Sequence, residues 1–129
     1  MAYPTTYRYT REHEWIELDG AIGSIGITDY AQNSLGDIVF VELPKVGDDV
    51  AAGKTFGSVE SVKAVSDLYA PASGKVVAVN DELATTPEKV NSDAHAAWMV
   101  RIQLKDPGEV NKLLSADDYD KFVKEEGGK

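Results

Sequence analysis

The sequence predicts a mainly β protein, a sandwich of two quasi-symmetric antiparallel sheets. The chain has fourteen valines but eight leucines, and β-branched side chains suit a pleated sheet better than a helix. Short runs of such residues are separated by turns rich in glycine, proline and aspartate. A faint internal repeat relates GDIVFV (36–41) to GKVVAV (74–79), and 47–50 to 87–90. This repeat predicts two similar halves that join near Lys63.

Seven segments have the composition of short strands. The strongest is DIVFVEL, which Pro44 ends, because proline cannot continue a strand ladder. A strand that alternates apolar residues with Gly and Ser, AIGSIGI, is expected to lie close to another backbone. In chain order the predicted strands cover 13–18, 21–27, 37–43, 55–60, 65–70, 75–80 and 98–104.

Helices are expected at few places. Thr28 can cap a short internal helix over 29–35, with Gly36 just beyond its end. A proline at the first position predicts a single helical turn over 86–90. Two capping sequences, at 106–109 and 115–118, each precede apolar residues at helical spacing, so a C-terminal helical segment is predicted over 106–126.

Length and composition limit the possible functions. A chain of 129 residues is expected to form one domain over 1–129, with its core at about 9–104. The net charge of −9 and the lack of a basic stripe argue against a nucleic-acid partner. The absence of cysteine excludes disulfides and thiolate chemistry. No apolar run is long enough to span a membrane, and no targeting segment is evident, which favours a cytosolic protein or the mature form of an imported one.

Lys63 is a lone ammonium group between two runs with strand character, GSVES and VSDLY. If these runs pair, the turn must fall within 61–64, which contains none of the Gly, Asn or Asp residues that tight hairpin turns favour. Such conflicts between local sequence and fold gather at functional sites. The alternative is an ordinary solvated turn lysine, and the residues alone leave both interpretations open.

Several motifs in order resemble one protein family. They are VESVKA around Lys63, YTREHEW at 9–15, GITDYAQ at 26–32 and LGDIVFVELP at 35–44. Together they are similar to the glycine cleavage system H proteins, a family of lipoyl carriers, and the similarity extends from about Tyr9 to Phe122. One segment departs from the family pattern: positions 93–97 read DAHAA where the family carries Pro-Tyr and a Gly before the Trp. The shape of this loop, and any partner contacts there, are therefore not predicted.

The resemblance implies a barrel-sandwich hybrid fold of the lipoyl and biotinyl type. It also implies that lipoic acid is joined to Lys63 through an amide bond. The protein would then be a carrier and not an enzyme, shuttling an aminomethyl group and reducing equivalents between glycine decarboxylase, aminomethyltransferase and dihydrolipoamide dehydrogenase. A lipoylating enzyme would be a fourth partner. A monomer is expected, in the bacterial cytoplasm, or in the mitochondrial matrix for a mature eukaryotic form.

Three acidic residues are candidates for the same site, Glu14 by resemblance and the other two by their position near Lys63. Glu14 lies where the family has a carboxylate near the loaded amine, although it could also be an exposed strand residue. Glu60, three residues before Lys63, would be recognised by the lipoylating enzyme. The alternative is that Glu60 is an ordinary solvated charge on a strand. Asp67 is a weaker candidate near the lysine. His13 and His95 lack metal-ligand spacing, and no nucleophile elbow is present; His13 is expected to pack beside Trp15.

Other carriers remain as alternatives. A lipoyl domain of a 2-oxo acid dehydrogenase has Asp-Lys-Ala at its tip, whereas this chain has Val62 before the lysine. Biotin carriers usually place methionines on both sides of the lysine, which Val62 and Ala64 do not match. A scaffold that resembles an H protein but carries no lipoate, with Lys63 free, is a third possibility.

Overall fold

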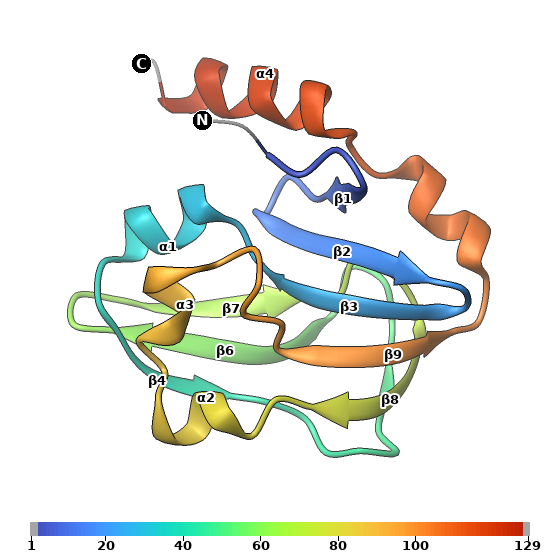
Figure 1. The fold of residues 1–129 in the computed structure, drawn as a ribbon, viewed down its shortest axis with the longest axis horizontal. Coiled ribbons are helices and arrows are strands. Elements are labelled where there is room, and N and C mark those ends of the chain that lie inside the picture. Colours follow the sequence, from blue (N-terminus) through green and yellow to red (C-terminus); the bar gives the residue numbers. More distant parts are fainter. Residues whose placement is uncertain (1–2, 128–129) are drawn as a thin grey trace.

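The computed structural model, which describes residues 3–127, contains two antiparallel sheets that enclose a common core (Figure 1). The larger sheet has six strands in the order β1-β2-β3-β9-β8-β5, and the smaller has three in the order β4-β6-β7. The core between them combines residues of both, such as Ile25 and Ile102 from the larger sheet and Val59 from the smaller. The predicted mainly β sandwich is confirmed.

All seven predicted strands are present, with ends that differ from the prediction by at most two residues. The large sheet consists of β1 (Tyr7–Tyr9), β2 (Glu14–Asp19), β3 (Ile22–Ile27), β5 (Asp49–Val50), β8 (Gly74–Val79) and β9 (Val100–Leu104). The small sheet consists of β4 (Ile38–Glu42), β6 (Thr55–Ser61) and β7 (Val65–Tyr69). The sequence did not predict β1 and β5, because strands this short leave no alternation to detect.

The internal helix follows its predicted caps. Helix α1 (Asp29–Leu35) begins after Thr28, whose Oγ1 accepts a hydrogen bond from the Ala31 amide at 3.2 Å. Gly36 follows it with φ of +80°, a conformation that residues with a Cβ rarely adopt. The helix therefore ends directly before β4.

The predicted helical turn over 86–90 is only partly right. Helix α3 (Lys89–Ser92) begins later, and an unpredicted helix, α2 (Glu82–Thr85), precedes it. Thr86 is not the cap of α3: it ends α2, where its amide donates to the Glu82 carbonyl at 2.8 Å, and Glu88 is the residue directly before α3. The two copies in the first part of the repeat form β4 and β8, which lie in different sheets. The second part is wrong, because 87–90 covers a turn and the start of α3 and is not a counterpart of β5.

The C-terminal segment forms a 3-10 helix, η1 (Pro107–Lys112), and then helix α4 (Ala116–Gly127). Both predicted caps are present: the Gly108 amide donates to Asp106 Oδ1 at 3.0 Å, and the Asp118 amide donates to Ser115 Oγ at 3.2 Å. None of the helices within residues 3–127 is long and apolar enough to cross a membrane.

Helix α4 lies over the edge of the large sheet and covers an aromatic cluster there (Figure 1). Tyr9 and Tyr119 stack with ring centroids 4.7 Å apart, and both are fully buried. The prediction that His13 packs beside Trp15 is wrong. His13 has φ of +72°, which turns its ring away from the strand and against Tyr30, Tyr119 and Phe122.

Candidate functional site

Lys63 lies at the tip of the turn that joins β6 to β7 (Figure 1). The Ser61 amide donates to the Ala64 carbonyl at 2.8 Å, so only Val62 and Lys63 form the loop. None of these four residues has a positive φ, which excludes the turn types that require Gly or Asn. The conflict noted in the sequence is thus resolved by a different kind of two-residue turn.

The side chain of Ser61 holds this turn closed. It is 6% exposed, and its Oγ accepts hydrogen bonds from the Ala64 amide at 3.1 Å and the Lys63 amide at 3.3 Å. The Val62 amide donates to the Asp37 carbonyl at 3.0 Å, which fastens the turn to the start of β4. With its backbone fixed from both sides, the turn presents the exposed Lys63 side chain in a defined direction.

Gly36 forms the surface on which the Lys63 stem rests. A Cβ atom added at Gly36 would lie 3.5 Å from Lys63 Cε. Asn91 on α3 holds this segment: its amide nitrogen donates to the Gly36 carbonyl at 2.9 Å, and its Oδ1 accepts from the Ile38 amide at 2.8 Å. Asn91 also donates to Gln32 Oε1 at 2.9 Å. One side chain therefore connects α1, β4 and α3 beneath the lysine.

Replacing Asn91 by alanine is expected to lower the free energy of unfolding by about 2 kcal/mol, because the Gly36 carbonyl and the Ile38 amide both lose their partner. Urea unfolding measures this change. Asn33→Ala, at an exposed position of α1, is the matched control and should change the free energy by less than about 0.5 kcal/mol. Equal effects of the two substitutions would contradict the structural role of Asn91.

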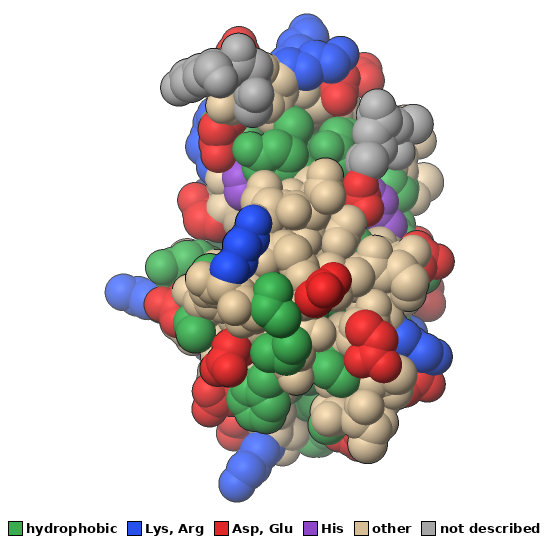
Figure 2. All heavy atoms as spheres, turned by 90° about the vertical axis from the view of Figure 1, so that its left-hand side faces the viewer, with side chains coloured by type: hydrophobic (Ala, Val, Ile, Leu, Met, Phe, Trp, Pro, Cys, Tyr) green, Lys and Arg blue, Asp and Glu red, His purple; other side chains and the backbone are tan. Residues whose placement is uncertain are grey.

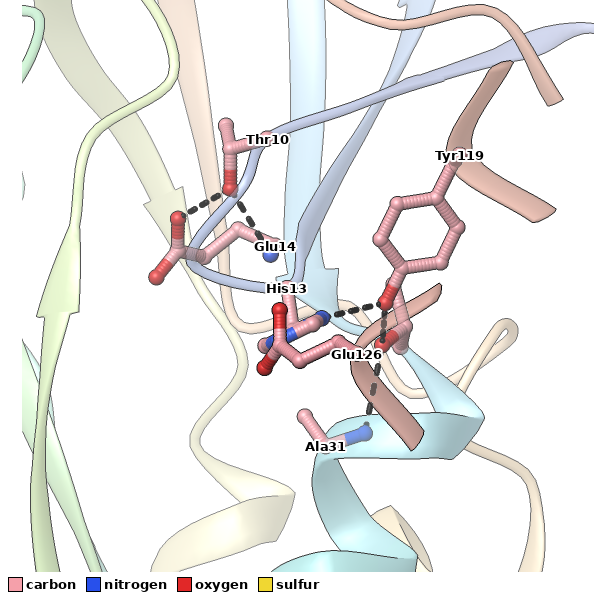
Figure 3. A network of polar contacts seen from close by, with 7 residues as sticks. Thr10, His13, Glu14, Ala31, Tyr119 and Glu126 are labelled. Atoms are coloured by element: carbon pink, nitrogen blue, oxygen red, sulfur yellow. Dashed lines mark hydrogen bonds and ion pairs between the residues drawn. The ribbon is translucent and has the colours of Figure 1, made fainter. Parts of the chain in front are cut away.

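Glu14 is buried, with 1% of its surface exposed, so the alternative of an exposed strand residue is wrong. Its Oε1 accepts a hydrogen bond from the Thr10 hydroxyl at 2.6 Å (Figure 3). Its Oε2 accepts one from the Tyr69 amide at 3.2 Å. Burial raises the pKa of Glu14 to about 7, although both hydrogen bonds oppose this rise. The carboxyl group is thus poised to change its charge near neutral pH.

A hollow of about 450 Å³ lies next to Thr10, and Glu14 itself does not line it. Thr10, which binds the Glu14 carboxyl group, is among the residues that line it, with Glu12, Ala70, Pro71 and Leu113. Tyr69, the other partner of Glu14, is four strand positions from Val65, a rise of about 13 Å. The structure therefore separates Glu14 from the Lys63 backbone by roughly the length of β7.

Glu60 and Asp67 occupy a different setting, on the outer face of the small sheet. Both are exposed, whereas Val59 and Leu68, their neighbours along β6 and β7, are buried in the core. Glu60 is paired in register with Val65, in the row nearest to the Lys63 turn. The three acidic candidates thus divide into one buried carboxyl group and two solvated ones.

The loop at 93–97, which departed from the family pattern, is fixed by contacts that the sequence did not reveal. The Trp15 indole donates to the Ala94 carbonyl at 3.0 Å, and the Tyr7 hydroxyl donates to the His95 carbonyl at 2.6 Å. His95 Nε2 accepts from the Asp29 amide at 3.1 Å, and burial lowers the pKa of His95, which favours the neutral ring. The loop thereby supports the start of α1.

A chain of polar contacts connects α4 with α1 (Figure 3). His13 Nδ1 lies 2.8 Å from the Tyr119 hydroxyl, which lies 2.7 Å from Thr28 Oγ1, the cap of α1. His13 Nε2 lies 3.3 Å from Glu126 Oε1. No cluster of three or more His, Cys, Asp or Glu side chains within residues 3–127 could hold a metal ion.

Comparisons with known proteins agree on one family. The sequence profile described as "Glycine cleavage H-protein" matches residues 7–126. The proteins named "Glycine cleavage system H protein" from Acidobacterium capsulatum and Koribacter versatilis are each 70% identical to the chain over 128 residues, covering 99% of both chains. The protein of the same name from Carboxydothermus hydrogenoformans is 58% identical over 125 residues, covering 96% of both chains.

Comparison with solved structures leads to the same family. The crystal structure of a glycine cleavage system H protein from Mycobacterium marinum superposes with a TM-score of 0.84 at 39% identity, covering 97% of this chain and 99% of that one. This similarity confirms the barrel-sandwich hybrid fold. Proteins of this kind are lipoyl carriers and are not themselves catalysts. The chain belongs to the glycine cleavage H-protein family.

Proposed function

We propose that this chain is the lipoyl-lysine carrier of a glycine cleavage system and that Lys63 is the attachment residue. The observation that carries the proposal is the presentation of Lys63: the lysine is exposed at the tip of a turn that Ser61 closes from within. Lys63 takes no part in the salt bridges formed within residues 3–127. Its amine is therefore accessible to an acylating enzyme.

The residues around Lys63 fit a covalently attached lipoyl group. Ala64 has a small side chain, and Gly36 has none and lets the lysine stem lie against its backbone, so neither residue places a bulky side chain beside the stem. When bound through an amide to Lys63, lipoate supplies a disulfide that can be reduced and can take up an aminomethyl group. The chain would carry this group between glycine decarboxylase, aminomethyltransferase and dihydrolipoamide dehydrogenase.

Glu14, Asp67 and Glu60 are proposed to serve the carrier in different ways. Glu14 is a buried carboxyl group whose partner Thr10 lines a hollow, and a protonated amine brought close to Glu14 would stabilise its charged form. Asp67 is exposed on β7, the strand that leads from Lys63 towards Tyr69 and Glu14, and would add negative charge along that path. Glu60 lies one row from the Lys63 turn, where the lipoylating enzyme would contact it.

The wider setting also belongs to the proposal. We infer one carrier domain over 1–129 that acts as a monomer in the cytoplasm of a bacterium. The bacterial origin of its relatives, and their similarity over nearly the whole chain, support this inference.

Intact mass spectrometry of the chain made in a bacterium that degrades glycine tests the attachment. We expect an increase by the mass of one lipoyl group, located at Lys63 by peptide mapping. Lys54, an exposed lysine just before β6, should remain unmodified and serves as the internal control. Protein that stays unmodified under growth on glycine would refute the proposal and favour the scaffold without lipoate.

A further inference from the structure

The outer face of the small sheet carries two rows of side chains that run across its three strands. Strand pairing places Phe40, Glu60 and Val65 in the first row, nearest to the Lys63 turn. The second row consists of Glu42, Ser58 and Asp67. We call the first row the Phe40 row. In this row the charged Glu60 has an apolar residue on each side, Phe40 on β4 and Val65 on β7.

A β-bulge in β4 turns Phe40 towards solvent. The pairing of β4 with β6 shifts between Ile38 and Phe40, so that Val39 is an extra residue. Ile38 and Val41 both face the core, and Phe40 is 53% exposed. In a regular strand Phe40 would face the same side as Ile38. Bulges are often found beside functional sites, where they redirect a side chain.

Exposed apolar side chains concentrate around this bulge and the Lys63 turn. Seven large hydrophobic residues within 3–127 are exposed, and four of them lie on β4 or on the β6–β7 hairpin: Val39, Phe40, Val62 and Val65. Figure 2 shows the end of the molecule that carries the turn, where hydrophobic and acidic side chains lie next to one another. Such a grouping at the surface is typical of an interaction site.

The charge of this face indicates the chemistry of its partner. The two rows contain three carboxylates, those of Glu42, Glu60 and Asp67, and no basic side chain. A complementary surface would have an apolar recess for Phe40 and Val65 with lysine or arginine at its rim.

The short reach of the lysine identifies the partner. An enzyme that acylates Lys63 must reach the amine at the end of a four-carbon stem that rests on Gly36, so its own surface must come into contact with the neighbouring strands. Enzymes that use the finished cofactor act at the far end of a longer arm. We propose that the Phe40 row is the docking surface for the lipoylating enzyme. This inference rests on the proposed function.

Lipoylation kinetics of the protein without its cofactor test this surface. A purified ATP-dependent lipoate ligase with free lipoate is the probe, and intact mass follows the product. We expect Phe40→Ser and Glu60→Lys each to lower kcat/KM about tenfold. Val77→Ser on β8 and Glu17→Lys on β2 are matched exposed controls in the other sheet and should stay within about twofold of the wild type. Thermal unfolding verifies that all four variants fold.

The outcomes separate this proposal from the proposed function. Wild-type rates in Phe40→Ser and Glu60→Lys would overturn the docking surface and leave the carrier function intact. A wild-type protein that accepts no lipoate would overturn the carrier function and, with it, the docking surface. Normal lipoylation of the two variants, combined with slower reduction of their lipoyl group by dihydrolipoamide dehydrogenase, would assign the row to another partner and also overturn the proposal.

Discussion

Lys63→Arg is expected to fold normally and to abolish support of glycine decarboxylation. Arginine keeps the positive charge and a similar length, but its guanidinium group does not form the amide that the cofactor requires. The fold should tolerate the change because Lys63 is exposed and its turn is held by Ser61 and Asp37. A reconstituted assay with glycine decarboxylase measures the loss, and thermal unfolding measures stability.

Lys75→Arg on β8 provides the control for this experiment, since Lys75 is also exposed but lies in the large sheet. Its activity should equal that of the wild type. Activity of Lys63→Arg at a comparable level would show that the carrier does not use this lysine.

Glu14→Gln is expected to remove a large pH dependence of stability. The folded-state pKa of about 7 is above the ordinary value of 4.5, so the folded protein binds more protons than the unfolded chain between these pH values. The stability that Glu14 contributes is therefore fully present below pH 4.5 and is lost as the pH rises through 7. For a shift of this size the loss is about 3 kcal/mol. The glutamine side chain cannot ionise and should not show it.

Urea unfolding at several pH values between 4.5 and 8 measures this difference. The wild-type free energy of unfolding should fall relative to that of Glu14→Gln across the range. Glu17→Gln, at an exposed position of the same strand, should parallel the wild type. Parallel curves for Glu14→Gln and wild type would contradict the raised pKa of the buried carboxyl group.

The positions of the strands were predictable from local sequence, because alternation and turn residues act over a few residues. The ends of α1 were predictable for the same reason, since Thr28 and Gly36 have capping chemistry. The burial of Glu14 also had a signal: in the strand it has the same parity as Ile16, a core residue. Exposure is predicted for this glutamate only when its residue type is given more weight than its position in the alternation of the strand.

Other features depend on contacts between distant parts of the chain. Asn91 meets Gly36 and Ile38 across 55 and 53 residues, and no periodic pattern marks an amide with this role. The exposure of Phe40 could not be predicted from the sequence. The side of a strand that a residue faces is deduced from alternation, and the bulge in β4 reverses that alternation. Lys63 could be proposed as the attachment residue only by resemblance, because a lysine in a turn carries little information by itself.

The contacts from Glu126 through His13 and Tyr119 to Thr28 tie the last helix to the end of the molecule that carries Lys63. Thr28 caps α1, and α1 ends at Gly36, against which the lysine stem lies. Proteolytic nicking ahead of Ala116 would therefore loosen not only the far edge of the larger sheet but also the Gly36 surface beneath Lys63. Carrier performance and resistance to trimming at the carboxyl end should decline together.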